Sequence, residues 1–326
     1  YHGNLVLVGA GTYAVSNLQI DKAAHLRGEA GAAQTILDAG NAARCLTLTA
    51  NAIMDGFTLR NGVSSNGGGA YLTAGMLVNV IALSNRAAAN GGGFWLGKGA
   101  RLSNCTARAN TANRGAGIHL DYGATATHCV ASHNFAYDRG GGAYLWYGML
   151  AHSLAHDNFA TNRAGGVYVA DGSEAAYCIV SNNTARQMGG GVYARVCLVN
   201  GCIISHNTVD QQGGGVYAER GAEINNSLIY ANLSKSFGGG VHGKFGAVNN
   251  CTIVSNRAVN FGGGVFADPI SIRNSIIYYN AAAFSTNFHA TSFDGAANCV
   301  TPAIAGGGTI TNPPAFRAFE QFLLKL

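Results

Sequence analysis

The chain has 326 residues, of which 48% are hydrophobic and only 11% are charged, so it can bury a large core. A net charge of +5 without a long basic block argues against a nucleic-acid partner. No apolar run approaches the ~20 residues that cross a bilayer, and 47 glycines against 4 prolines exclude a proline-rich disordered chain.

Three regions follow one another along the chain and are expected to form a single domain. Residues 1–66 predict two or three irregular starting coils. A regular glycine repeat begins at Gly67 and is expected to run to residue 297. Residues 298–326, which include three of the four prolines, predict a closing cap or the start of a further segment, because the end of a solenoid must be covered.

Glycine triplets, or close variants of them, recur at intervals of 24 or 25 residues. They begin at Gly67, Gly91, Gly115, Gly140, Ala164, Gly189, Gly213, Gly238 and Gly262. An asparagine stands six residues before most of them, as Asn183 does before Gly189. A repeat of this length indicates a unit that buries its apolar face only by stacking on its neighbours.

Each repeat contains two short segments in which apolar residues alternate with period 2, the pattern of a β-strand. One follows the triplet, as in Val192-Tyr193-Ala194, and the other precedes the asparagine, as in Cys178-Ile179-Val180. Short strands joined by glycine and asparagine corners predict an all-β fold, a right-handed parallel β-helix solenoid of roughly 11–13 coils with about 24 residues each. The asparagines are expected to stack as an internal ladder.

One inward column of the second strand consists of cysteines that alternate with serine and valine. It contains Cys105, Cys129, Cys178, Cys202 and Cys251. Small residues that exchange in this way are typical of a core, so we expect buried, reduced thiols. Cys45, Cys197 and Cys299 lie outside the column, and their pairing is open. No spacing of ligands or glycines in the chain points to a cofactor.

The opening coils contain Gly11-Thr12-Tyr13, Leu26-Arg27-Gly28 and Gly56-Phe57-Thr58-Leu59, and they resemble those of pectate-lyase-like right-handed β-helix proteins. The Gly-Gly-Gly-Val-Tyr and Asn-Cys-x-Ile-x-x-Asn units are similar to repeats of chlamydial polymorphic outer membrane proteins and related bacterial surface proteins. The resemblance covers about residues 10–285. It implies the fold and leaves the activity open, because this fold hosts lyases, hydrolases, epimerases and adhesins.

An outward column of rings is predicted on the strand after each triplet. It contains Tyr71, Trp95, His119, Tyr144, Tyr168, Tyr193, Tyr217, His242 and Phe266. The third glycine of each triplet is expected to precede the ring on the same face and to leave a shallow trough floored by backbone. Rings beside polar groups suit sugars, so the members of this column from Trp95 to His242, together with Trp146, are candidate glycan ligands. Stacking that only stabilises the sheet is the alternative interpretation.

The sharpest catalytic candidates are His119, Asp121 and Tyr144, which lie on that column or two residues beyond it. A β-eliminating lyase needs a base and a cation that neutralises the uronate. The nearest cations, expected only at the edges, are Lys98, Arg114 and Arg139. Stacked acidic residues that would form a pectate-lyase calcium site are also missing. We therefore favour a non-enzyme over a polysaccharide lyase or glycoside hydrolase.

A second outward column is apolar and predicts a surface for self-association. It includes Ile81, Val130, Ile179, Ile203 and Ile276. His128 and His152 share another outward column and are weak candidates for a shared metal ion. Together these patterns favour a secreted or bacterial cell-surface module that binds glycans or has a structural, adhesive role. The alternatives are a polysaccharide lyase or glycoside hydrolase and a self-assembling filament or surface-layer subunit.

Overall fold

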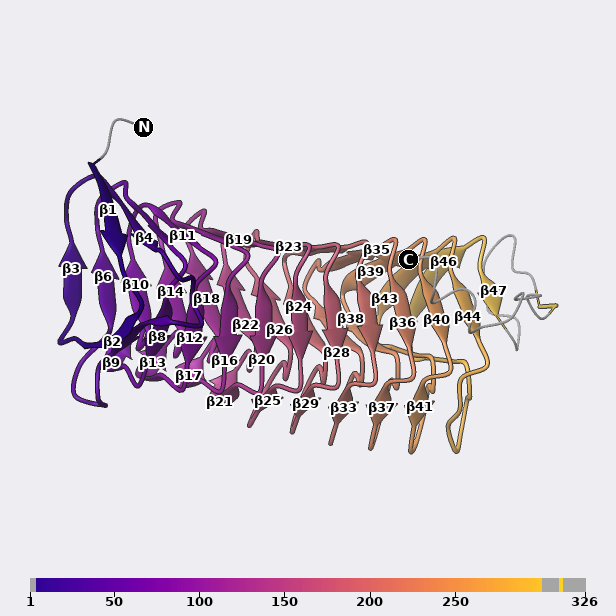
Figure 1. The fold of residues 1–326 in the computed structure, drawn as a ribbon. Helices are drawn as coiled ribbons and strands as arrows, with labels where there is room; N and C mark the ends of the chain where they lie inside the picture. Colours follow the sequence, from indigo (N-terminus) through magenta and orange to yellow (C-terminus); the bar gives the residue numbers. More distant parts are fainter. Residues whose placement is uncertain (1–3, 301–310, 313–326) are drawn as a thin grey trace.

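The computed structural model describes residues 4–300 and 311–312, and it is a parallel β-solenoid (Figure 1). Sheet A has 13 strands, from β1 (Asn4–Val8) to β46 (Phe293–Ala296), and sheet B has 13, from β2 (Gly11–Ala14) to β47 (Cys299–Val300). Sheet C has 12 strands, from β3 (Leu18–Ile20) to β45 (Phe288–Ala290). The described residues contain no helix, and therefore none that spans a membrane. The predicted fold and coil length are confirmed.

One coil passes through the sheets in a fixed order. Strand β23 (Met149–Ala151) of sheet A leads to β24 (Leu154–His156) of sheet B, and β25 (Phe159–Ala160) follows in a fourth sheet, D. Strand β26 (Val167–Ala170) of sheet C closes the coil. Each strand pairs in parallel with its counterpart one coil on, so equivalent residues of the repeat stack directly on one another.

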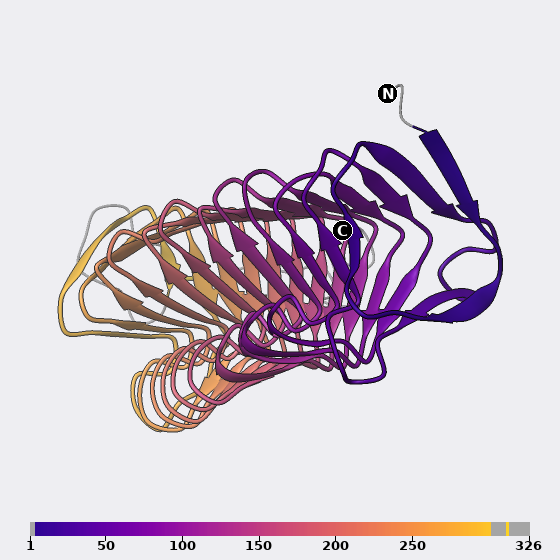
Figure 2. The same ribbon diagram turned by 90° about the vertical axis from the view of Figure 1, so that its left-hand side faces the viewer.

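Sheet D was not predicted and forms a narrow second lobe beside the main coil (Figure 2). Its nine strands run from β9 (Val63–Asn66) to β41 (Arg257–Ala258). A small core of its own consists of stacked alanines, namely Ala87, Ala112, Ala116, Ala136 and Ala160. The lobe covers one side of sheet C and therefore shapes the candidate site.

The cysteine column lies in the main core, as predicted. Cys105, Cys178 and Cys202 are each 1% exposed, and all eight cysteines, which lie in the described residues, are unpaired. Cys45 and Cys197 are buried, whereas Cys299 is half-buried. Burial raises the pKa of the Cys251 thiol to about 12, so this thiol stays protonated at neutral pH.

The asparagine ladder is confirmed and runs from Asn85 to Asn280, ending on Asn287. Each oxygen of the ladder accepts both the side-chain amide and the backbone N–H of the asparagine one coil before it. Each side-chain amide also donates to a backbone carbonyl, as Asn183 does to Ala155 at 2.9 Å. The buried amides therefore have their donors and acceptors satisfied.

The third glycine of each triplet faces the interior, and its predicted place on the outer face is wrong. A Cβ atom on Gly142 would lie 2.8 Å from the carbonyl oxygen of Gly166 and 2.9 Å from Nδ2 of Asn158. The first glycine, Gly140, has φ of 65°, so the chain turns there and strand alternation does not extend back through the triplet. Glycine is required at this position because the asparagine ladder lies against it, and not because it lines an outer trough.

Corners of the coil place single non-glycine residues in the left-handed region. In one coil these include Tyr147, His152 and Asp157, with φ of 54°, 49° and 54°, and the buried Ala164 with φ of 56° at the start of the triplet. Side chains at the first three corners project outward, beyond the strands. The sheets cross the predicted boundary at residue 66 without a break, since β6 (Leu46–Leu48) pairs with β10 (Ala70–Leu72). Most of the predicted segment 298–326 lies outside the described residues.

Candidate functional site

The predicted ring column exists on sheet C and is stacked in register. The His119 and Tyr144 rings lie 4.9 Å apart with 6° between their planes, and the Tyr144 and Tyr168 rings lie 4.8 Å apart with 4°. The stack continues through Tyr193 and Tyr217 to His242. Because strand spacing in a sheet is about 4.8 Å, each ring covers the face of the next.

The expected open trough is absent from His119 to His242, since the rings there are buried, whereas Tyr71, Trp95 and Phe266 are half-buried. Tyr168 is 1% and Tyr193 0% exposed. Their faces are covered by neighbouring rings, and residues of the second lobe cover them from the side: the guanidinium of Arg139 lies 5.6 Å from the Tyr168 ring centre, and that of Arg163 lies 5.1 Å from the Tyr193 ring centre. The unpredicted lobe is the physical reason for this difference.

A ladder of arginines lines the ring column. Arg114, Arg139 and Arg163 occupy equivalent positions on consecutive coils of the lobe. The carboxylate of Asp138 lies 3.4 Å from Nε of Arg114 and 3.2 Å from Nε of Arg139. The expectation that the nearest cations lie only at the edges is therefore wrong for Arg114 and Arg139, because the lobe folds back and places them against the rings, whereas Lys98 is exposed at a corner.

His119, Asp121 and Tyr144 are brought together by β18 (Ile118–Asp121) and β22 (Ala143–Trp146). Nε2 of His119 lies 3.1 Å from Oδ1 of Asp121, while Nδ1 of His119 is buried without a hydrogen-bond partner. Burial raises the pKa of Tyr144, and the positive charges of Arg114 and Arg139 oppose that increase. His119 is 3% and Tyr144 8% exposed.

A second polar network, which the sequence did not reveal, surrounds Tyr193. Its hydroxyl donates a 2.6 Å hydrogen bond to Oε1 of Glu219 and accepts one of 3.2 Å from Nη1 of Arg163. Burial and the Glu219 carboxylate raise the pKa of Tyr193, so its hydroxyl stays protonated at neutral pH. The sequence gives little indication of this network, because Glu219 lies one coil away from Tyr193 and Arg163 lies on the lobe.

Three exposed aromatic side chains adjoin His119 and Tyr144. Trp146 is 37% exposed at the end of β22, and the corner residues Tyr122 and Tyr147 are 60% and 51% exposed. The Tyr122 ring lies 5.6 Å from that of Trp146 and 6.4 Å from that of Tyr147. Trp146 was among the predicted glycan ligands but the two tyrosines were not, although each directly follows the same strand position in consecutive coils.

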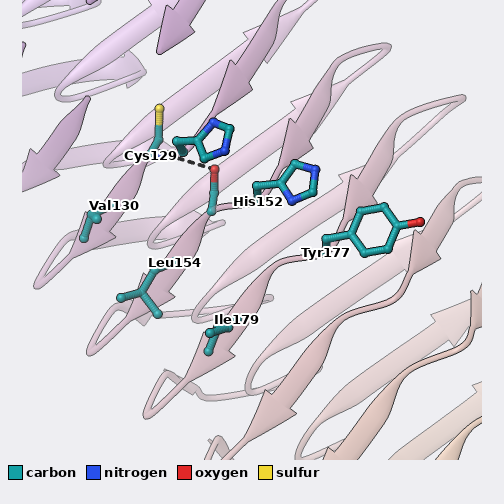
Figure 3. Close-up of a pocket in the computed structure, with 8 residues that line it drawn as sticks. Cys129, Val130, His152, Leu154, Tyr177 and Ile179 are labelled. Carbon is teal, nitrogen blue, oxygen red and sulfur yellow. Dashed lines mark hydrogen bonds between the residues drawn. The ribbon is translucent and has the colours of Figure 1, made fainter. Parts of the chain in front are cut away.

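A separate shallow groove runs beside sheet B (Figure 3). The rings of His128, His152 and Tyr177 follow one another along the corner, and Leu154 and Ile179 project from the strands next to them. The predicted apolar stripe does face outward, with Ile179 44% exposed and the other members half-buried.

His128 and His152 stack with their ring centres 5.4 Å apart and 10° between the planes. The ring nitrogens of parallel stacked imidazoles direct their lone pairs along separate planes, so this pair does not converge on one ion. Within residues 4–300, no group of three or more His, Cys, Asp or Glu side chains is placed to hold a metal ion.

The sequence matches no known family model and none of the curated proteins with which it was compared. Among solved structures, the A-module of Azotobacter vinelandii mannuronan C-5 epimerase AlgE4 superposes with a TM-score of 0.52 and 14% identity, covering 94% of this chain and 87% of that one. The PL6 family alginate lyase AlyGC gives 0.46 and 11%, covering 94% and 50%. At such identities the similarity establishes the β-helix fold.

Proposed function

We propose that this chain modifies an acidic polysaccharide, and that His119, Asp121 and Tyr144 form the reacting centre, with Arg114 and Arg139 binding the sugar carboxylate. The observation that carries the proposal is the arginine ladder beside the ring column. If no cation lies nearby, His119 and Tyr144 cannot stabilise the negative charge that develops on a uronate. Lobe residues supply two cations, Arg114 and Arg139, and the Asp138 carboxylate lies between them.

Lyases and epimerases that act on uronates share a first step, in which the proton next to the carboxylate is removed. The electron pair left behind is delocalised onto the carboxylate, and fixed positive charge stabilises it most where water is scarce. The Arg114 and Arg139 side chains are 42% and 26% exposed, so a carboxylate in solution can reach them. Arginine also fits a carboxylate in a bidentate geometry.

His119 is suited to be the base. The Asp121 carboxylate, 3.1 Å from Nε2, is placed to stabilise the positive charge that the ring gains when it takes up a proton, and the Nδ1 atom has no hydrogen-bond partner. Tyr144 is suited to be the proton donor, because its raised pKa keeps the hydroxyl protonated at neutral pH. The fold shared with the AlgE4 A-module, a mannuronan C-5 epimerase, supports this reaction class. The proposal also implies a secreted or cell-surface location, where such polymers occur.

A glycan-binding module without turnover is the second candidate. The burial of His119 and Tyr144 favours it, because a polymer can reach their polar atoms only if side chains of the lobe move aside. In that case the arginines and the exposed aromatic residues bind the polymer, and His119 with Asp121 only stabilises the stack.

Incubation with polymannuronate and polygalacturonate, combined with a binding measurement, separates these candidates. Unsaturated ends report elimination, and NMR of the polymer reports epimerisation. We expect product with the unmodified chain, none with His119→Ala or Tyr144→Phe, and nearly unchanged binding by both variants. His128→Ala, a stacked histidine on a different corner, is the matched control and should keep full activity. Binding without product would establish the second candidate, and neither binding nor product would contradict both.

A further inference from the structure

We infer that Tyr122, Trp146 and Tyr147 form a subsite that binds the apolar face of the sugar unit next to the one that reacts. This inference rests on the proposed function and names a part of the substrate that the arginines do not recognise. Trp146 lies on the same strand as Tyr144, two residues further on, and pairs in register with Asp121. At about 3.3 Å per residue, the subsite lies about 7 Å along the strand from the reacting centre.

The three side chains form an exposed cluster that contributes nothing to the main core. Trp146 lies 5.9 Å from Tyr147 and 5.6 Å from Tyr122, measured between ring centres, and all three rings remain at least 37% exposed. Large aromatic side chains gathered on a surface are unusual in a protein that does not use them for binding. A hexose presents an apolar face of C–H bonds and a polar rim, which match a ring face and a tyrosine hydroxyl.

Neighbouring coils leave the cluster open. In the column of Trp146, Gly97 lies two coils earlier and Ala170 lies one coil later. No long side chain at these two positions therefore covers the indole. On the next coil, Gly172 lies so close that a Cβ atom there would be 3.2 Å from the Tyr147 ring. Small residues on both sides thus confine the aromatic cluster to two coils and keep it accessible.

The backbone does not explain why tyrosine stands at these corners. Tyr122 and Tyr147 have φ of 47° and 54°, a region in which asparagine and glycine cost less than a bulky residue. In later coils the equivalent corner holds Asp171, Val196, Arg220 and Phe245. The fold accepts various residues here, and what sets Tyr122 and Tyr147 apart is that they stand on consecutive coils beside the exposed Trp146.

The test uses three variants, Trp146→Ala, Tyr122→Asn and Tyr147→Asn, with uronate monosaccharides and hexasaccharides as probes in calorimetric titrations. The asparagine substitutions suit the left-handed corners and should leave the fold intact. Tyr177→Asn is the matched control, because Tyr177 is also a corner tyrosine, with φ of 53° and 57% exposure, on the far groove. Circular dichroism and thermal unfolding confirm that each variant is folded.

We expect each variant to weaken hexasaccharide binding by about 3- to 10-fold, the effect of one lost aromatic contact, and to leave monosaccharide binding and the control unchanged. If the chain turns over its substrate, KM should rise by the same factor while kcat stays constant. Turnover with unaltered KM in all three variants would overturn the subsite but not the proposed function. Length-dependent binding that the variants lose, in a chain without turnover, would support the subsite and contradict the reaction. Self-association that is lost in Trp146→Ala would instead identify a second copy as the occupant and overturn the inference.

Discussion

The side-chain amide of Asn183 donates a 3.0 Å hydrogen bond to Oδ1 of Asn207, and the same oxygen accepts the backbone N–H of Asn183 at 3.0 Å. Each position of the ladder thus needs one group that donates twice and accepts twice in a buried site. Among the side chains of this length, only a primary amide does so.

Replacing Asn183 with alanine should lower the free energy of unfolding by about 2–4 kcal/mol, because the N–H and the amide of Asn158 both lose their acceptor in a buried site. Asn183→Asp should also be destabilising, since a carboxylate cannot donate to the carbonyl of Ala155. Urea unfolding followed by circular dichroism measures the effect. The neighbouring Asn182→Gly, exposed and at φ of 55°, serves as the control and should change stability little.

Val196→Gly should stabilise the fold by about 1 kcal/mol. Val196 is a β-branched residue with φ of 47° and 47% exposure, so glycine removes backbone strain while little burial is lost. Val259 has the same exposure but is not a left-handed residue, and Val259→Gly should instead be destabilising. Equal effects of the two substitutions in urea would show that the corner carries no strain.

His242 should make stability depend on pH in a defined window. Burial lowers its pKa to about 4 from 6.5, and the charge of Asp268 only partly opposes this. Between these values the unfolded chain binds a proton that the folded chain does not, so stability falls as the pH drops from about 6.5 to about 4. The expected loss is up to about 3 kcal/mol.

Thermal unfolding across this pH range measures the dependence. His242→Phe should flatten it, because phenylalanine already occupies the next position of the column at Phe266. The exposed His206→Asn variant should retain the full slope. A slope that persists in His242→Phe would assign the titration to another group.

We propose that the apolar stripe on sheet B mediates self-association, and its test is direct. Ile179→Lys and Ile203→Lys introduce charge next to the groove and should shift any oligomer in sedimentation experiments towards monomer without changing the fold. Val259→Lys, equally apolar and exposed but on the lobe, is the control. An unmodified chain that sediments as a monomer at all concentrations would refute the proposal.

Periodicity predicted the coils, the asparagine ladder and the thiol column because each depends on residues that recur every 24 or 25 positions and face the core. The third glycine of each triplet faces inward but was predicted to face outward, since alternation does not continue through a residue such as Gly140 with positive φ. Strand patterns assign faces only where the chain is extended.

The candidate site was predicted in part. His119, Asp121 and Tyr144 share one face of adjacent strands, which period 2 reveals. Their burial and their cations were missed, because both depend on the second lobe, in which strands such as Phe159–Ala160 are too short for an alternation to be read. Partners such as Arg163 and Tyr193 are 30 residues apart and meet only after the lobe folds back.

The asparagine ladder, the stacked rings and the sheets all join each coil to the coils directly before and after it. This has a genetic consequence. Excising residues 184–207 would join Asn183 to Thr208 and bring Asn183 opposite Asn232, so the remaining amides could pair as before. The coil is thus a cassette, and duplication or loss of one in a gene would lengthen or shorten the rod without demanding a new interior.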